Sequence, residues 1–359
     1  MSTTDNLTIT RILTEVAARQ ASDVHFSVGS QPIIRHDGKL EPLAEELAVT
    51  PEFMQELVGF FIDEAGQTTL AQQKNLTLSY ALDNRARFRV HLSYQKGYPA
   101  VDLRLISVQI PEAATLGLPK RIIDLTDERE GLIVISGPAG SGRTTTLISL
   151  LDYINHQSAR HIVTFEDPVE YLINNDRSFV QQKSLGADVP NISAGLENLR
   201  SEDVDVLGIS VPLAMADWQQ VLTLARAGTL VLVIIEADSA VRALESMVAS
   251  WPGETAEGLK IMLGETFLGS VSQRLVARLG GGRVLVTECL LGIPPVRSLI
   301  KEGKVVQLQN VLQLSRGEGM VSLEQSLAQL VNNGEILPEE AKKQAVSQEA
   351  LASILRVKE

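Results

Sequence analysis

Residues 132–144 have the sequence LIVISGPAGSGRT, and this stretch decides the fold. An apolar run of strand length leads directly into the glycine-rich segment 137–144, and the residues that follow have the pattern of a helix. Glycines at the spacing G-x-x-x-x-G-[basic]-[ST] let backbone N–H groups curl around phosphate oxygens, and the positive end of the following helix adds to the attraction. The stretch therefore predicts a phosphate-binding loop; an ordinary glycine-rich connection is the alternative.

The loop supplies the candidate nucleotide-binding residues, which are Gly137, Gly140, Ser141, Gly142, Arg143, Thr144 and Thr145. The expected ligands are ATP and Mg²⁺, and the ion is expected to bind the Thr144 hydroxyl. Arg143 stands where the motif normally has lysine. Because a guanidinium is longer, planar and forked, it cannot take the place of a compact ammonium between the β- and γ-phosphates. We therefore expect phosphate binding to survive and the geometry for γ-phosphate transfer to suffer.

The chain has a different texture on each side of residue 110. After it, near-continuous apolar runs alternate with helical patterns, which is typical of strands buried on both faces of a parallel sheet. Strands are expected over 131–136, 161–165, 204–209 and 230–235, and helices over 144–155, 215–227 and 238–249. Before it, short alternating strands and the hairpin turn Asp37–Gly38 predict a small α+β domain. We predict an α/β protein with an N-terminal domain at 1–110, a linker at 111–120, a nucleotide-binding domain at 121–296 and a helical segment at 297–359.

The composition of the 359-residue chain excludes several classes of protein. A hydrophobic fraction of 44% is too high for a disordered chain, and the single Cys289 excludes an internal disulfide framework and a structural zinc site. The formal charge of −12 argues against direct binding of nucleic acid. The apolar runs fall far short of the roughly 20 residues that a spanning helix needs, so we expect no membrane insertion. The N-terminus lacks a signal-peptide pattern, and we expect a cytoplasmic protein.

Four further stretches accompany the phosphate loop in an order found in a known family. They are ASDVHFSVGSQPIIRHDGKL (21–40), HIVTFEDPVEY (161–171), SQRLVARLGGGRV (272–284) and PPVRSLIKEGKV (294–305). With them the chain resembles the secretion ATPases of the type II secretion/type IV pilus (GspE/PilT-type) family, and within it the pilus retraction (PilT-type) branch. The resemblance covers residues 21–336. It implies a PAS-like N-terminal domain, a RecA-like P-loop ATPase domain and a hexameric ring, formed with itself or with a related pilus ATPase. It also implies a place at the inner-membrane base of a pilus machine, beside the platform protein.

The resemblance implies roles for residues outside the loop. Glu166 and Asp167 match the family's aspartate box, where Glu166 is a candidate base and Asp167 a candidate metal ligand. The alternative for Asp167 is that it caps a turn. Arg87, Arg89 and Arg104 match arginines that approach the nucleotide when the domains of the family close. Alternating arginines are otherwise the solvated face of a strand.

Two other catalytic motifs of the family have changed. Val211 aligns with the Walker B glutamate. Asp205 does not replace that acid, because it lies at the amino end of its strand and ligands bind outside the carboxyl ends. Glu236 aligns with the family's histidine, so that an anion stands near the expected place of the γ-phosphate. Either catalysis has been lost, or Glu236 supplies the missing carboxylate from the neighbouring strand and is itself a candidate catalytic residue.

The three altered positions favour a degenerate paralogue, because stabilisation of phosphoryl transfer depends on several groups acting together. We expect a PilT-like pseudo-ATPase that binds ATP, hydrolyses it slowly or not at all, and modulates or inhibits the retraction or extension of a pilus. One alternative is an active hexameric retraction ATPase that drives pilus depolymerisation for twitching motility or DNA uptake. The other is an interaction module whose loop binds no nucleotide.

Overall fold

The computed structural model describes residues 3–36, 39–82, 86–106, 109–251, 253 and 255–356. The chain divides into two compact units, each with its own sheet. The first consists of Met1–Gln109 with Asp167–Leu172, and the second of Ile110–Glu166 with Ile173–Glu359. The α/β class predicted from the sequence is confirmed. The predicted linker at 111–120 and the boundary before residue 297 stay predictions.

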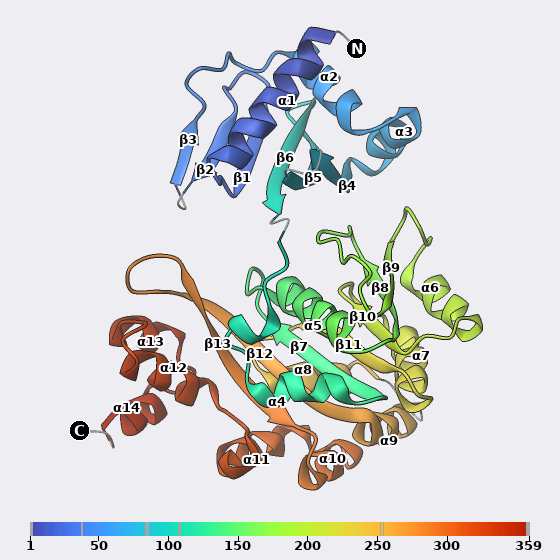
Figure 1. Ribbon diagram of the computed structural model, residues 1–359, viewed down its shortest axis with the longest axis vertical. Helices are drawn as coiled ribbons and strands as arrows, with labels where there is room; N and C mark the ends of the chain where they lie inside the picture. Colours follow the sequence, from blue (N-terminus) through green and yellow to red (C-terminus); the bar gives the residue numbers. More distant parts are fainter. Residues whose placement is uncertain are drawn as a thin grey trace. The chain divides into compact units, whose positions relative to one another are not determined.

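The first unit has a six-stranded antiparallel sheet with the strand order β3-β2-β1-β6-β5-β4 (Figure 1). Its strands are β1 (Asp23–Ser27), β2 (Ile33–His36), β3 (Lys39–Pro42), β4 (Asn75–Leu82), β5 (Ala86–Gln95) and β6 (Tyr98–Ile106). Its helices are α1 (Thr3–Ala18), α2 (Pro51–Phe61) and α3 (Glu64–Gln73). Along β5, Phe88 and Val90 enter the core while Arg87 and Arg89 lie on the opposite face, as the period of a strand requires. The predicted turn Asp37–Gly38 lies outside the described residues.

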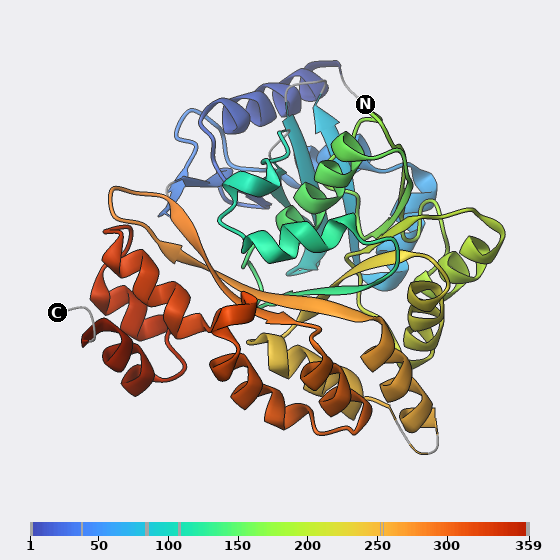
Figure 2. The ribbon, with the colours of Figure 1, turned by 60° about the horizontal axis from the view of Figure 1, so that its bottom comes forward.

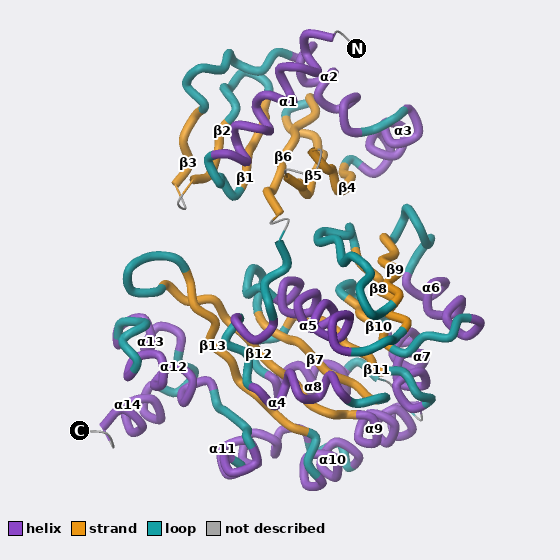
Figure 3. The backbone as a smooth tube through the Cα atoms, viewed as in Figure 1, coloured by secondary structure: helices purple, strands orange, loops and turns teal. Residues whose placement is uncertain are grey.

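The second unit has a seven-stranded sheet with the order β13-β12-β7-β11-β10-β8-β9 (Figure 3). All neighbours are parallel except β12 and β13. The strands are β7 (Gly131–Gly137), β8 (His161–Glu166), β9 (Phe179–Ser184), β10 (Val206–Ile209), β11 (Leu230–Glu236), β12 (Phe267–Ala277) and β13 (Arg283–Leu291). Every residue of β7 is buried, because helices pack against it and a strand pairs with it on each side. The apolar run 132–135 of this strand agrees with that burial.

The helices of the second unit connect and cover these strands. They are α4 (Lys120–Asp124), α5 (Arg143–Gln157), α6 (Ile192–Asn198), α7 (Met215–Arg226), α8 (Ala240–Ala249), α9 (Thr255–Thr266), α10 (Pro294–Lys301), α11 (Leu308–Leu314), α12 (Leu323–Asn332), α13 (Pro338–Gln344) and α14 (Gln348–Arg356). Short 3₁₀ turns lie at Ala113–Thr115, Leu125–Asp127, Leu199–Ser201, Val305–Gln307 and Arg316–Glu318. Helices α5, α7 and α8 fall where the sequence predicts them, within two residues at each end.

The antiparallel hairpin β12–β13 carries the C-terminal helices. Helices α12, α13 and α14 gather beside the hairpin in both ribbon views (Figures 1 and 2). Val276 of β12 and Val286 of β13 share a core with Leu327, Ala341 and Leu351 of those helices. The C-terminal segment is therefore packed onto the nucleotide-type sheet as part of the second unit.

Candidate functional site

The phosphate loop lies where the sequence predicts it, between β7 and α5. Gly140 and Gly142 have φ angles of +75° and +88°, which a residue with a Cβ adopts only with strain. A Cβ atom at Gly137 would collide with the carbonyl oxygen of Gln273 on the neighbouring strand β12. The glycines therefore allow the conformation of the loop and its close packing against β12, next to the N-terminus of α5, where an anion is favoured.

Buried hydroxyls in and before the loop fit a phosphate ligand. Ser136 is fully buried at the end of β7, and Ser141 in the loop is 4% exposed. Within the described part of the chain neither Oγ atom has a hydrogen-bond partner. The backbone of Ser141 is fixed, since its carbonyl oxygen accepts a hydrogen bond of 2.8 Å from Gln273 Nε2. Buried polar atoms are normally paired, and a phosphate at the loop would offer these two neighbouring hydroxyls a partner.

Arg143 and Glu236 form an ion pair across the edge of the loop. Arg143 Nη2 lies 3.3 Å from Glu236 Oε2, and the two side chains are 15% and 70% exposed. Glu236 ends β11 directly opposite Gly137 of β7. The structure therefore brings together two residues that the sequence analysis singles out separately. Thr144 and Thr145, in the first turn of α5, are half-buried.

The carboxyl end of β10 carries an apolar side chain. Ser210 and Val211 follow this strand, and Val211 is 3% exposed. Ser210 N donates to the carbonyl oxygen of Phe165 at 3.0 Å, which fixes the backbone beside β8. Asp205 lies at the amino end, where its Oδ2 accepts a hydrogen bond of 2.8 Å from His161 N. Asp205 thus links strands β8 and β10 at their amino ends, at the opposite end of the strands from the loop.

Glu166 is buried at the end of β8. The residue is 1% exposed, and its Oε1 accepts hydrogen bonds from Thr164 Oγ1 at 2.7 Å and Gln182 Nε2 at 2.9 Å. These bonds connect β8 with β9 and hold the carboxylate inside the sheet. Asp167, the next residue, is exposed and belongs to the first unit.

The three candidate arginines lie in the first unit. Arg104 Nε lies 3.0 Å from Asp23 Oδ1 on the neighbouring strand β1. Arg89 Nη1 lies 3.2 Å from Glu170 Oε1, and Arg87 Nε donates to Ser79 Oγ at 2.8 Å. Their predicted approach to a nucleotide stays a prediction.

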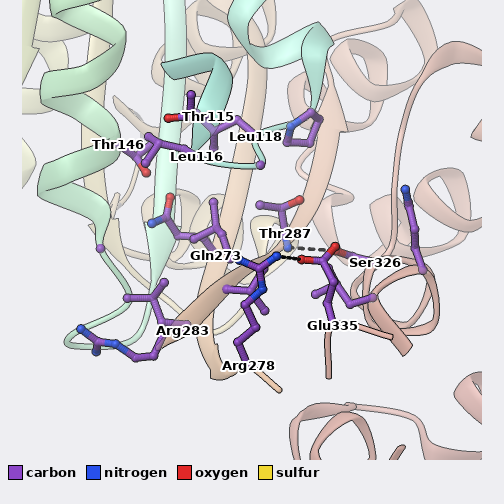
Figure 4. A pocket seen from close by; sticks show the side chains of 18 of the residues that line it. Thr115, Leu116, Leu118, Thr146, Gln273, Arg278, Arg283, Thr287, Ser326 and Glu335 are labelled. Atoms are coloured by element: carbon purple, nitrogen blue, oxygen red, sulfur yellow. Dashed lines mark hydrogen bonds and ion pairs between the residues drawn. The ribbon is translucent and has the colours of Figure 1, made fainter. Parts of the chain in front are cut away.

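A cavity of about 630 Å³ lies beside the phosphate loop within the second unit (Figure 4). Gly142, Thr145 and Thr146 line it together with residues of the predicted linker, among them Leu116 and Leu118. Figure 4 also shows the Arg278–Glu335 ion pair, with Nη2 and Oε2 3.0 Å apart, which joins the hairpin to the C-terminal helices. The cavity is large enough for a small organic ligand that continues from the loop.

A second cavity, of about 380 Å³, lies on the Glu236 side of the loop. Arg143 and Glu236 line it together with mostly apolar side chains, among them Val211, Trp218 and Met247. Sequence reasoning missed both cavities. The sequence of Pro111–Pro119 predicts only a linker. Leu116 and Leu118 line the first cavity because the folded chain brings this segment beside α5, which the sequence does not reveal.

Burial raises the pKa of Glu288 on β13 to about 7, and the charge of Glu324 adds to this effect. The Ala240 N–H donates to Glu288 Oε1 at 2.8 Å and lowers the pKa in part, as does Arg274. Arg274 itself donates to the carbonyl oxygens of Asp238 and Gln344, at 3.2 and 2.8 Å. These contacts tie the start of α8 and residue Asp238, which follows β11, to the hairpin.

The described part of the chain shows neither a reactive thiol nor a metal-binding cluster of side chains. Burial raises the pKa of the Cys289 thiol to about 12, so this thiol is not a nucleophile near neutral pH. Across the described ranges, His, Cys, Asp and Glu side chains nowhere gather in threes as a metal cage would need. A Mg²⁺ ion at the loop would rely on the Thr144 hydroxyl and on oxygens of the phosphates themselves. No helix in the described part of the chain is long and apolar enough to cross a membrane.

Comparisons with known proteins agree with this geometry. The sequence model of the family described as "Type II/IV secretion system protein" matches residues 4–280. The chain is 30% identical over 342 residues to the "Type IV pilus retractation ATPase PilT" of Pseudomonas aeruginosa, across 94% of this chain and 98% of that protein. It is 31% identical to a twitching motility protein of Neisseria gonorrhoeae, across 89% of this chain and 86% of that protein. A crystal structure of the pilus retraction motor PilT with bound ADP matches with a TM-score of 0.88 and 31% identity, across 96% of this chain and 99% of that one.

Proposed function

The chain belongs to the type II/IV secretion system protein family, and from this membership we propose that it is a PilT-like paralogue that binds ATP, hydrolyses it slowly or not at all, and modulates a pilus or secretion motor. The nucleotide would bind the loop residues Gly137–Thr145, and Thr144 would hold Mg²⁺. The neighbouring cavity is the natural place for the rest of the nucleotide. When bound, the ion would neutralise charge on the phosphates; the chain's own contribution is the cradle of amides and hydroxyls.

The Arg143–Glu236 ion pair is the observation that carries this proposal. In a working P-loop enzyme the basic residue meets the terminal phosphates and a carboxylate at a strand end orients water or metal. Here the basic group is shared with Glu236, and the end of β10 presents Val211. Glu166 is hydrogen-bonded inside the sheet, so its use as a base would require those bonds to break. The site is thus suited to binding phosphates and poorly suited to hydrolysing ATP.

An assay of ATP turnover tests the proposal. Purified protein is measured in steady-state and single-turnover experiments with Mg²⁺, alongside fluorescent-nucleotide binding. We expect binding with turnover at least 10-fold below roughly 1 s⁻¹, the lower end of typical enzyme turnover. Turnover near 1 s⁻¹ would overturn the pseudo-ATPase, and a folded protein without nucleotide affinity would leave only the interaction module.

A working retraction motor is the second candidate, and the position of Glu236 favours it. This carboxylate ends the strand next to β7, at the edge of the sheet where ligands of α/β proteins bind. It could take over the lost Walker B carboxylate. Deletion of the gene separates the two candidates. Loss of pilus retraction would favour a motor, whereas excess retraction or altered piliation would favour a modulator.

The proposed partners follow from the same family membership. A modulator would act in a ring, hexameric like that expected of the family, built from its own copies or shared with an intact pilus ATPase. It would act at the platform protein on the cytoplasmic face of the inner membrane. Co-purification of the tagged chain with an intact pilus ATPase, compared with the chain alone by light scattering, tests for mixed and homomeric rings.

A further inference from the structure

Glu236 stands at the point where a triphosphate would extend beyond the phosphate loop. Its backbone lies opposite Gly137, the first glycine of the loop, in the register of β11 and β7. Its carboxylate lies 3.3 Å from the guanidinium of Arg143. The basic residue at this position of a P-loop reaches the β- and γ-phosphates. A phosphate that meets Arg143 from the Glu236 side therefore meets the carboxylate as well.

The described lining of the cavity on the Glu236 side supplies no second cation to offset this carboxylate. Among the described residues that line the cavity on that side, Arg143 is the one cationic side chain and Glu236 the one anionic side chain. The remaining lining residues are apolar or carry hydroxyls, such as Val211, Trp218 and Ser246. A γ-phosphate placed there would compete with Glu236 for Arg143 and would be repelled by it.

We propose that Glu236 makes this site select a nucleoside diphosphate over a nucleoside triphosphate. The inference rests on the proposed function, because it requires that the loop bind a nucleotide. A diphosphate satisfies the amides of the loop and meets Arg143 with its β-phosphate alone, so it disturbs the Arg143–Glu236 pair less. A triphosphate must break or share that pair. The chain would then respond more strongly to the diphosphate that a neighbouring motor releases than to the triphosphate that the motor consumes.

The expected size of the selection is modest. Glu236 is 70% exposed, so water and salt screen its charge. We expect ADP to bind about 10-fold more tightly than a non-hydrolysable ATP analogue, which corresponds to about 1.4 kcal/mol. The preference should decrease at high salt, because the repulsion is electrostatic and exposed.

Calorimetric titration of the full chain with ADP and with the ATP analogue tests the inference. Both ligands are measured in EDTA and again with Mg²⁺, for the wild type and for Glu236→Gln. The substitution keeps the shape of the side chain and removes its charge. We expect it to strengthen binding of the triphosphate about 10-fold and to leave the affinity for ADP within about 2-fold, so that the selection disappears.

Glu257→Gln is the matched control. Glu257 is exposed in the first turn of α9 and lines neither cavity, so this variant changes the net charge equally but should keep the selection. The inference is wrong if Glu236→Gln leaves the ratio of affinities unchanged. It is also wrong if this variant weakens Mg²⁺-dependent triphosphate binding, since Glu236 would then be a metal ligand. If neither nucleotide binds to folded wild-type protein, the proposed function fails as well, and that result is distinct from equal binding of both.

Discussion

The phosphate loop has the features of a phosphate-binding site, whereas the neighbouring strand ends of the same sheet lack the side chains expected for hydrolysis. The loop has its glycines in left-handed conformations, its buried hydroxyls and its close seat on β12. One and two strands away, the end of β11 presents Glu236 and the end of β10 presents Val211. Binding depends mainly on the loop, and chemistry depends mainly on the strand ends.

This difference shows why nucleotide binding and hydrolysis can be lost separately. The amides of the loop act through backbone geometry, which a few glycines and the packing on β12 maintain. Hydrolysis requires side chains from several strands to act at once, and their effects are strongly non-additive. Substitution of one strand-end residue can therefore remove hydrolysis while the loop remains intact.

The largest expected effect is a gain of ATP turnover when the strand ends are restored together with the loop's basic residue. The triple variant Arg143→Lys, Val211→Glu, Glu236→His returns a compact ammonium, a carboxylate and an imidazole. We expect its turnover to exceed that of the wild type by about 100-fold or more, because removing a single well-placed group from such a site costs about that much. Steady-state phosphate release with Mg²⁺ is the measurement.

The single variants are the controls for this gain. Each is expected to change turnover less than 10-fold, because one restored group lacks its partners. Triple-variant turnover equal to that of the wild type, in a protein that folds and binds nucleotide, would contradict the view that these three positions limit hydrolysis. High turnover of the wild type would show that the residues at the strand ends do not limit hydrolysis.

A stability effect of up to about 3 kcal/mol is expected at Glu288, beneath the N-terminus of α8. Burial raises its pKa to about 7 in the folded chain, above the ordinary value of 4.5. The folded state therefore holds this proton more tightly than the unfolded state, and stability falls as the pH rises from about 4.5 to 7. Glu288→Gln removes that loss, so the variant should be more stable than the wild type at pH 8, and the advantage should vanish near pH 4.5.

Chemical denaturation followed by tryptophan fluorescence measures this effect. Trp218 and Trp251 are both buried in the second unit, so the signal reports on the unit that contains Glu288. The exposed Glu257→Gln serves as the control and should show no such pH dependence. An advantage of Glu288→Gln that is equal at pH 5 and pH 8 would show that the carboxyl group does not titrate in this range.

Much of the fold follows from local patterns in the sequence. The apolar runs 132–135 in β7 and 230–235 in β11 predict buried parallel strands, and helices α5, α7 and α8 lie within two residues of their predicted bounds. The hairpin β12–β13 is not predicted. Its first strand contains Ser272, Gln273 and Arg274, which lower its apolar character although Gln273 is 1% exposed. The amide is buried there because it supports Ser141 of the loop, and only the tertiary structure provides that partner.

The candidate site also has one part that the sequence predicts and one part that only the structure reveals. A continuous motif identifies the loop, since its chemistry resides in consecutive backbone groups. The pairing of Arg143 with Glu236 joins residues 93 positions apart, and it depends on β11 lying next to β7. The resemblance to the family predicts an unusual residue at each position, but the contact between them requires the strand order. The network of Arg274, Glu288 and Glu324 likewise becomes visible only once the C-terminal helices are packed onto the hairpin.

The smallest expected effect separates two glycines within the loop itself. Gly140→Ala meets no atom within 4 Å and should lose about 1 kcal/mol of stability, because its positive φ disfavours a Cβ. Gly137→Ala also meets the carbonyl oxygen of Gln273 and should lose about 2–3 kcal/mol. Denaturation followed by tryptophan fluorescence measures both. If the two variants lose the same stability, the loop does not depend on its seat against β12. The conformation of the glycines alone would then maintain the loop, and packing against β12 would contribute nothing to it.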